Sequence, residues 1–246
     1  MRVLHCVPSL DPRHGGPSQT VVALTDALAR TGELTVALLA QGAAGRPVVP
    51  GAEPSVVRRV LIGHQRPVLA LGLPMRRGLA EVASAARPAL IHSHGVWHPA
   101  GHWAARAARA WRVPLILHPR GMLEPWALGQ KAWKKRLALA AFQRRDLQQA
   151  WVLVATSVLE RDNLRALGLR QPVAVVPNGV ALPADADVGA PDDGAQAGRQ
   201  RVALFLSRVH PKKGVIELVH AWSQAAPRGW RLVIAGPDEG GHAAEV

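Results

Sequence analysis

The sequence lacks the features that mark secreted or membrane-spanning proteins. It contains one cysteine, so a disulfide framework is excluded. The N-terminal apolar stretch is short and is broken by Pro8, which is far less than the apolar core of a signal peptide. No later apolar run is long enough to cross a membrane. These absences make a cytoplasmic protein the expectation, and Cys6, within an apolar run, is predicted to be a small buried hydrophobic residue.

Acidic residues are scarce as well. Lys and Arg together number 30 against 17 Asp plus Glu, which gives a formal net charge of +13. This surplus favours anionic partners such as nucleoside diphosphates, acidic lipid headgroups or nucleic acid, and charge alone does not choose among them. The basic residues are dispersed and no nucleic-acid recognition motif is present, so we expect no nucleic-acid partner.

Short apolar, β-branched runs alternate with longer segments of helical period along the chain. This alternation predicts βαβ units around a parallel sheet, and therefore an α/β fold. Strands are expected at Val3–Pro8, Leu34–Ala40, Val56–Ile62, Ala89–His94, Pro114–His118, Trp151–Ala155 and Val173–Val176. Helices are expected at Pro17–Arg30, Leu73–Arg87, Pro99–Trp111, Trp126–Gln149 and Val158–Leu167.

The composition predicts two domains joined by a linker. Residues 181–200 are rich in Ala, Asp, Gly and Pro and offer almost nothing to pack, which is typical of a linker. A Rossmann-like domain is expected over residues 1–180 and a second one over residues 201–246. The second domain would contain a strand at Val202–Leu206, a helix at Gly214–Gln224 and a strand at Trp230–Ala235. One βαβ unit cannot bury both faces of a parallel sheet, so we expect this domain to be incomplete.

Two turns between a strand and a helix have the composition of phosphate-binding sites. After the first strand, Gly15 and Gly16 let a ligand approach the backbone, and Pro17 begins a helix whose free amide groups attract phosphate. This loop lacks the patterns of dinucleotide and P-loop sites, which disfavours those two classes. In the second domain, Arg208 and Lys213 flank a similar turn and could hold a diphosphate and neutralise it as a leaving group without a metal. Each turn could also be an ordinary connection.

Short motifs occur in the order seen in one enzyme family. They are Gly15-Gly16, His118-Pro119-Arg120-Gly121-Met122-Leu123, Val176-Pro177-Asn178-Gly179-Val180, Arg208 with Lys213-Gly214, and Ala235-Gly236-Pro237. In this ordered set the chain resembles the retaining family 4 glycosyltransferases of GT-B fold, most closely bacterial members that build surface polysaccharides or exopolysaccharides. The resemblance implies sugar transfer with retention from a nucleoside-diphosphate sugar to a hydroxyl of a glycan or lipid-linked acceptor. It implies no cofactor and no metal.

The resemblance also assigns roles to residues on the donor side. It implies that Gly15, Gly16 and Asn178 lie at the donor's diphosphate. It further implies that Arg208 and Lys213 bind this diphosphate and act in catalysis.

A catalytic histidine and an acceptor side follow from the same resemblance. His118 ends a strand at the sheet edge where open α/β folds bind ligands, and the resemblance implies that it contacts the transferred sugar. The candidates on the acceptor side are His94, Trp97, Arg120 and Glu124. In that family a Glu-x7-Glu segment completes the donor site further along the second domain, and this sequence ends at Val246 before it could occur. We therefore expect the chain alone to be inactive.

Four histidines suggest a metal site. His92 and His94 share a strand face, and His98 and His102 stand one helical turn apart. No acidic or cysteine ligand accompanies them, which favours structural or acceptor-contact roles over zinc.

The segment Lys131–Arg145 combines apolar residues at helical spacing with a dense basic surface. It is either a core-packed helix with a charged outer side or a helix that rests on anionic lipid at the inner face of the cell membrane. Three other functions stay open for the chain as a whole. They are a GT-B sugar-nucleotide epimerase, a non-catalytic remnant, and a basic protein that binds nucleic acid.

Overall fold

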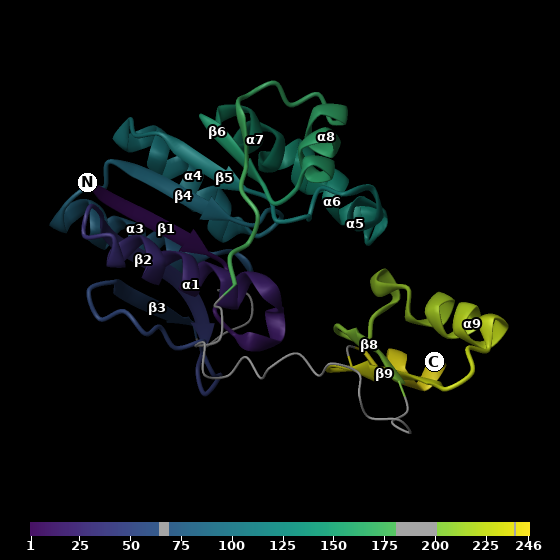
Figure 1. Ribbon diagram of the computed structural model, residues 1–246. Coiled ribbons are helices and arrows are strands. Elements are labelled where there is room, and N and C mark those ends of the chain that lie inside the picture. The colour runs from purple at the N-terminus through teal and green to yellow at the C-terminus, as the bar shows by residue number, and fades with distance from the viewer. Residues whose placement is uncertain (64–68, 181–200, 239) are drawn as a thin grey trace. The chain divides into compact units, whose positions relative to one another are not determined.

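The computed structural model describes residues 1–63, 69–180, 201–238 and 240–246. The chain divides into two compact units, Met1–Val180 and Ala181–Val246, and each contains a sheet of its own (Figure 1). The linker predicted over residues 181–200 lies outside the described residues.

The first unit is built on a seven-stranded sheet of order β3-β2-β1-β4-β5-β6-β7, in which every neighbouring pair is parallel. The strands are β1 (Arg2–Val7), β2 (Thr35–Ala43), β3 (Val57–Gly63), β4 (Leu90–His94), β5 (Leu115–His118), β6 (Val152–Ala155) and β7 (Val173–Val175). All seven predicted strands are present, and the α/β class is confirmed. The strand order reverses between β1 and β4, which makes this position the switch point of the sheet.

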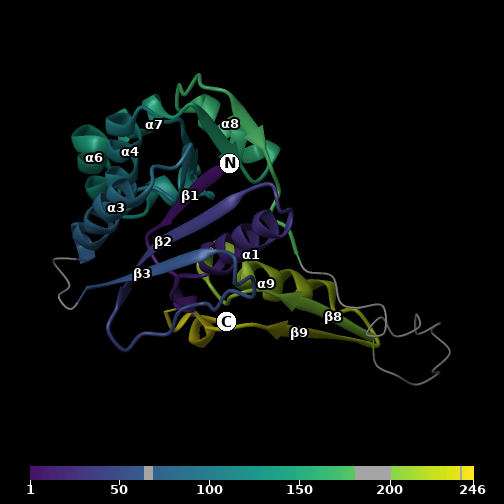
Figure 2. The same ribbon diagram turned by 90° about the vertical axis from the view of Figure 1, so that its left-hand side faces the viewer.

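Helices cover both faces of this sheet. They include α1 (Gly16–Arg30), which follows the short η1 (Pro12–His14), and α3 (Leu73–Ala85), α4 (Pro99–Trp111) and α8 (Val158–Ala166). α1 lies on one face and α3 and α4 lie on the other (Figure 2). The core is divided accordingly, because buried residues of α1 pack in one apolar cluster and those of α3 and α4 in a second one. Burial on both faces explains why the strands read as continuous apolar runs.

The prediction of one helix over Trp126–Gln149 is wrong. The segment forms α5 (Pro125–Gly129), α6 (Ala132–Ala138), a π-helical turn η2 (Leu139–Gln143) and α7 (Arg144–Gln149). Gly129 ends α5, and Lys131 then takes the left-handed conformation with φ of 50°. Glycine favours a helix end, so this local break interrupts a segment whose apolar spacing continues on both sides.

The second unit is a single βαβ element. It consists of β8 (Arg201–Leu206), η4 (Pro211–Lys213), α9 (Val215–Ala225), β9 (Trp230–Ala235) and η5 (His242–Glu245), with β8 and β9 parallel. The predicted strand, helix and strand are therefore confirmed. The two-stranded sheet leaves Leu204 and Leu206 exposed. Across both units, no described helix has the length and apolar character needed to span a membrane.

Candidate functional site

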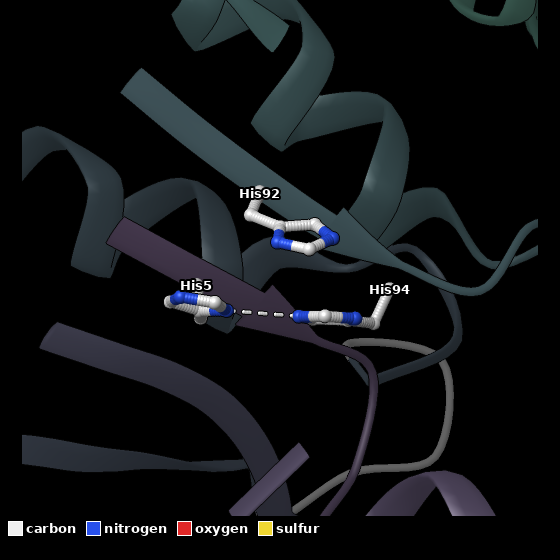
Figure 3. Close-up of side chains that lie close together, drawn as sticks. All are labelled: His5, His92 and His94. Carbon is white, nitrogen blue, oxygen red and sulfur yellow. Dashed lines mark hydrogen bonds between the residues drawn. The ribbon is translucent and has the colours of Figure 1, made fainter. Parts of the chain in front are cut away.

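Three strands of the first unit bring four histidines together near their carboxyl ends. His5 of β1 is in register with His92 of β4, and His94 of β4 is in register with His118 of β5. The ring centroids of contacting pairs lie 4.2 to 6.0 Å apart. We call these four residues the histidine cluster, and three of its members are drawn in Figure 3. The cluster lies at the switch point, where open α/β sheets bind ligands.

All members of the histidine cluster are neutral at pH 7. Burial, with a smaller contribution from the charge of Arg120, lowers the pKa of His5 to about 4 and that of His118 to about 3. Burial also holds the pKa of His92 and His94 well below 6.5, and the neighbouring histidines and Arg120 add to this effect. Each neutral ring therefore has one nitrogen that donates and one that accepts.

Arg120 fixes which nitrogen carries the proton in two of these rings. Nη2 of Arg120 lies 3.3 Å from Nδ1 of His94, and a guanidinium only donates, so this nitrogen accepts. The proton of neutral His94 is then on Nε2, which donates to Nδ1 of His5 over 3.0 Å (Figure 3). The proton of His5 must therefore be on its own Nε2. This chain of hydrogen bonds runs from a cation into the buried centre of the sheet.

The backbone at Arg120 is unusual for an arginine. The amide of Met122 donates to the carbonyl of Pro119 over 3.3 Å, which closes a tight turn directly after β5. Both central residues of this turn, Arg120 and Gly121, have positive φ, of 56° and 71°. Such turns favour Asn and Gly, because other residues are strained in the left-handed conformation. Strain of this kind indicates that the position is held by an arginine for the sake of its side chain.

The guanidinium of Arg120 joins segments that are far apart in the sequence. Its Nη1 donates to Oγ1 of Thr20 on α1 over 2.8 Å and to Oδ1 of Asn178 over 3.0 Å. Thr20 in turn donates to the carbonyl of Gly16 over 2.9 Å. The structure thus brings His94, His118, Arg120 and Asn178 into one connected site with Gly15 and Gly16, which we call the glycine corner of the first unit.

The glycine corner leaves room for a ligand. Gly15 has φ of 83° and ψ of −154°, a conformation that is almost confined to glycine. At Gly16 an added Cβ would meet no atom within 4 Å in the described structure. A ligand can therefore approach the backbone at the start of α1.

A pocket of about 440 Å³ opens beside the histidine cluster. Its walls include the carboxyl ends of β1, β2 and β4 together with apolar side chains such as Leu69 and Met122. Arg13, Arg46 and His94 also line it. Both ring nitrogens of His94 are already engaged, so this residue offers the pocket its ring and not a free hydrogen-bonding atom.

The other acceptor-side candidates lie around the turn after β5. The amide of Trp97 donates to Gln143 over 2.7 Å, and its indole N–H donates to the carbonyl of Met122 over 3.0 Å, so both polar atoms are used inside the protein. Glu124 begins α5, where its carbonyl accepts from the amide of Leu128. These contacts hold the turn in place from the side of α5 and η2.

The predicted grouping of four histidines is only partly formed. His98 accepts from the amide of Ala100 at the start of α4, and His102 lies 2.9 Å from Asp146, so both are occupied elsewhere. Sequence analysis missed His5, although a polar residue within a buried apolar strand was a usable signal.

Three of the clustered histidines could in principle hold a metal ion. One nitrogen of each of His5, His92 and His94 lies within 4.8 Å of the others (Figure 3). A metal bound by His94 would displace either its hydrogen bond to His5 or its contact with Arg120, and would lie near this guanidinium without an anionic ligand among the described residues. The charge of Arg120 and the lack of an anionic ligand among the described residues fit a stack of neutral rings better than a metal site.

Arg208 and Lys213, the residues predicted to bind the diphosphate, both lie in the segment that joins β8 to α9. Arg208 follows β8 and is half-buried, whereas Lys213 ends η4 and is exposed. Gly214 then begins α9 with φ of 67°. Nearby, a Cβ at Gly236 would clash with the carbonyl of Ser207, which explains the glycine after β9. Both cations therefore lie at the carboxyl end of a parallel strand, as in the first unit.

The chain belongs to the family described as "Glycosyl transferase 4-like domain", whose model matches residues 15–179. The predicted family 4 resemblance is thereby confirmed. A comparison with curated protein sequences gives no match.

Solved structures of several nucleotide-binding proteins share the fold of this chain. Anabaena Alr3699/HepE in complex with UDP has 18% identity and a TM-score of 0.64 over 99% of this chain and 63% of that one. The catalytic domain of Starch Synthase IV from Arabidopsis thaliana, bound to ADP and acarbose, has 13% identity and a TM-score of 0.65 over 98% and 69%. The UDP-GlcNAc 2-epimerase from Methanocaldococcus jannaschii has 9% identity and a TM-score of 0.56 over 99% and 67%. The Rossmann-like GT-B class is confirmed, and the chain spans less than two thirds of the HepE chain.

Proposed function

We propose that this protein transfers a sugar, with retention of configuration, from a nucleoside-diphosphate sugar to a hydroxyl of a glycan or lipid-linked acceptor. The observation that carries the proposal is membership of a glycosyltransferase family together with a cationic, histidine-lined site at the switch point of the sheet. The UDP, UDP-glucose and ADP complexes of proteins with this fold support a nucleotide-sugar donor. We place the reaction in the synthesis of bacterial cell-surface polysaccharide.

The residues would divide the work as follows. Arg208 and Lys213 neutralise the charge that develops on the nucleoside diphosphate when its bond to the sugar breaks, so no metal is required. Gly15 and Gly16 leave the backbone of the first unit open to an anionic group of the substrate. His118 contacts the transferred sugar at the end of β5.

The acceptor would occupy the pocket beside the histidine cluster. The pocket lies at the carboxyl edge of the sheet, and its volume of about 440 Å³ is within the range of small-ligand sites. Because both ring nitrogens of His94 are engaged, His94 would contribute packing surface to this pocket, whereas Trp97 does not line it and packs behind the turn after β5. Glu124, which follows the turn after β5, stays a candidate for contact with the acceptor.

The donor side can be tested by calorimetry with UDP, GDP and ADP on the full 246-residue chain. We expect Arg208→Ala and Lys213→Ala each to weaken binding by about tenfold to a hundredfold, since each removes a charged hydrogen bond to phosphate. The matched control is Arg228→Ala, which removes the same charge from the turn at the amino end of β9. Unchanged affinity in both test variants would exclude these residues from the diphosphate site.

An epimerase is the second candidate, because UDP-GlcNAc 2-epimerases also share the fold. An assay with UDP-glucose and UDP-GlcNAc separates the two activities. A transferase releases UDP only when an acceptor is present, whereas an epimerase changes the sugar with no acceptor. Interconversion without acceptor would favour the epimerase.

We also propose that α5 and α6 attach the protein to the inner face of the cell membrane. Residues 125–145 contain six Lys or Arg and no acidic residue. Trp126, Trp133 and Leu137 are exposed, and α6 buries no residue. Exposed apolar groups among cations suit a surface of anionic lipid better than water.

Vesicle flotation tests this attachment. We expect the protein to float with vesicles of phosphatidylcholine and phosphatidylglycerol, to float poorly with phosphatidylcholine alone, and to dissociate at about 0.5 M salt, where surface charges are screened. Trp133→Ala should reduce flotation severalfold. Trp151→Ala removes an equally exposed tryptophan from another surface and should have no effect. Equal flotation with both lipids would contradict the proposal.

A further inference from the structure

We infer that Arg120 is an oxyanion-binding residue, which holds a phosphoryl oxygen of the ligand at the carboxyl edge of the first unit's sheet. The inference rests on the proposed function. Two sources supply this chemistry, namely the diphosphate of the donor and a phosphate group on the acceptor.

Arg120 has no paired counter-charge among the described residues. Within the described parts of the chain, no carboxylate forms an ion pair with Arg120, and its hydrogen-bond partners are the neutral side chains of Thr20, Asn178 and His94. The Nε atom is buried with no partner in the same residues. Burial lowers the pKa of Arg120 to about 10, which reflects the unfavourable desolvation of its charge.

Glu160 is the acidic residue whose charge acts on Arg120, and its oxygens already accept hydrogen bonds from other groups. Glu160 is buried and opposes part of the desolvation effect, but its two oxygens accept from the amides of Gly121 and Thr156 and from the Thr156 hydroxyl, over 2.6 to 2.7 Å. Arg58 provides the contrast, because this partly buried arginine forms an ion pair with Asp26. Charged side chains are rarely removed from water without such a pair, so the position of Arg120 favours an anion supplied by a ligand.

The guanidinium of Arg120 is fixed on one side and open on the other. Nη2 contacts His94, which is itself hydrogen-bonded to the buried His5, and the tight turn fixes the backbone of Arg120. Nη1 faces Asn178, which is exposed, and Thr20, which adjoins the open space at Gly16. An oxyanion can replace the neutral amide oxygen of Asn178 at Nη1 without disturbing the buried side. A prepositioned arginine gives the strongest hydrogen bonds to phosphate.

The test measures binding of UDP, inorganic pyrophosphate and glycerol 1-phosphate to the full chain by calorimetry. We expect Arg120→Gln to weaken binding of pyrophosphate or of glycerol 1-phosphate by tenfold or more, and Arg120→Lys to weaken it less. Arg112→Gln is the matched control, because Arg112 is an exposed arginine with φ of 57° at the end of α4. Loss of UDP and pyrophosphate binding identifies the donor as the source, and loss of glycerol 1-phosphate binding identifies the acceptor.

A second pair of variants keeps Arg120 in place. Thr20→Asp brings a carboxylate to Nη1 and should weaken anion binding by tenfold or more, whereas the neutral Thr20→Asn should leave it within about twofold of wild type. Circular dichroism establishes that the variants are folded.

The outcomes separate the inference from the proposed function. If Arg208→Ala abolishes UDP binding while Arg120→Gln and Thr20→Asp change no affinity, the inference is wrong and the proposed donor site stands. If UDP does not bind, and pyrophosphate or glycerol 1-phosphate binds in a way that depends on Arg120, the inference stands and the proposed donor is wrong. Absence of binding of all three probes to the wild-type protein overturns the inference.

Discussion

Lowering the pH from about 7.5 to about 5 is expected to destabilise the protein steeply. The four histidines of the cluster are neutral in the fold, whereas in the unfolded chain each has a pKa of about 6.5. The folded pKa is about 4 for His5 and about 3 for His118, and it is well below 6.5 for His92 and His94. The unfolded state therefore binds more protons across this interval, and the free energy of unfolding falls as the pH falls.

The expected slope follows from the number of histidines. Each contributes up to about 1.4 kcal/mol per pH unit below 6.5, so four give up to about 5.6 kcal/mol per pH unit. Urea unfolding followed by tryptophan fluorescence at several pH values measures it. The slope is proportional to the number of protons taken up on unfolding. His92→Phe should reduce this number by about one, while His220→Phe, at an exposed position of α9, should leave it unchanged. Uptake of less than one proton on unfolding of the wild type would show that the cluster is charged or hydrated in the folded protein.

Replacing Glu160 by alanine is expected to destabilise the first unit by about 3 to 5 kcal/mol. The carboxylate is buried and accepts three hydrogen bonds, from the amides of Gly121 and Thr156 and from the hydroxyl of Thr156. These bonds join α8 to the end of β6 and to the turn that carries Arg120. Without the carboxylate, the donors are left without acceptors beside a desolvated guanidinium.

Urea unfolding at pH 7.5 measures this loss. Glu160→Gln should cost less than the alanine variant, because the amide oxygen still accepts from one side. Glu81→Ala is the control, since this carboxylate forms an exposed ion pair with Arg59 and such pairs contribute little. A loss below about 1 kcal/mol for Glu160→Ala would mean that water replaces the carboxylate.

Local signals predicted all the strands and most of the helices of the fold. Apolar runs marked the strands, and proline at the first helical positions marked the starts of α1 and α4. The same reasoning failed over Trp126–Gln149, because the helical apolar spacing continued through the break at Lys131. A single left-handed residue changes the path of the chain without changing the pattern.

The site was predicted less completely than the fold. The position of His118 at a strand end follows from the sequence, since the strand and its end are local. The contacts of Arg120 with Thr20 and Asn178 join residues 100 and 58 positions apart, and depend on the strand order of the sheet. The series of hydrogen bonds from Arg120 through His94 to His5 depends in addition on the register of β1 against β4. These are tertiary facts that no local pattern contains.

The left-handed backbone at Arg120 has a consequence for attempts to make this protein more robust. A glycine would occupy that position without the strain of about 1 to 2 kcal/mol that an L-residue has there, so any search for higher melting temperature should favour it. The same exchange would delete the guanidinium that joins α1, β4 and the segment after β7. Heat tolerance and ligand recognition therefore compete at this one residue, and a thermostable variant selected without a binding screen would lose its anion contact first.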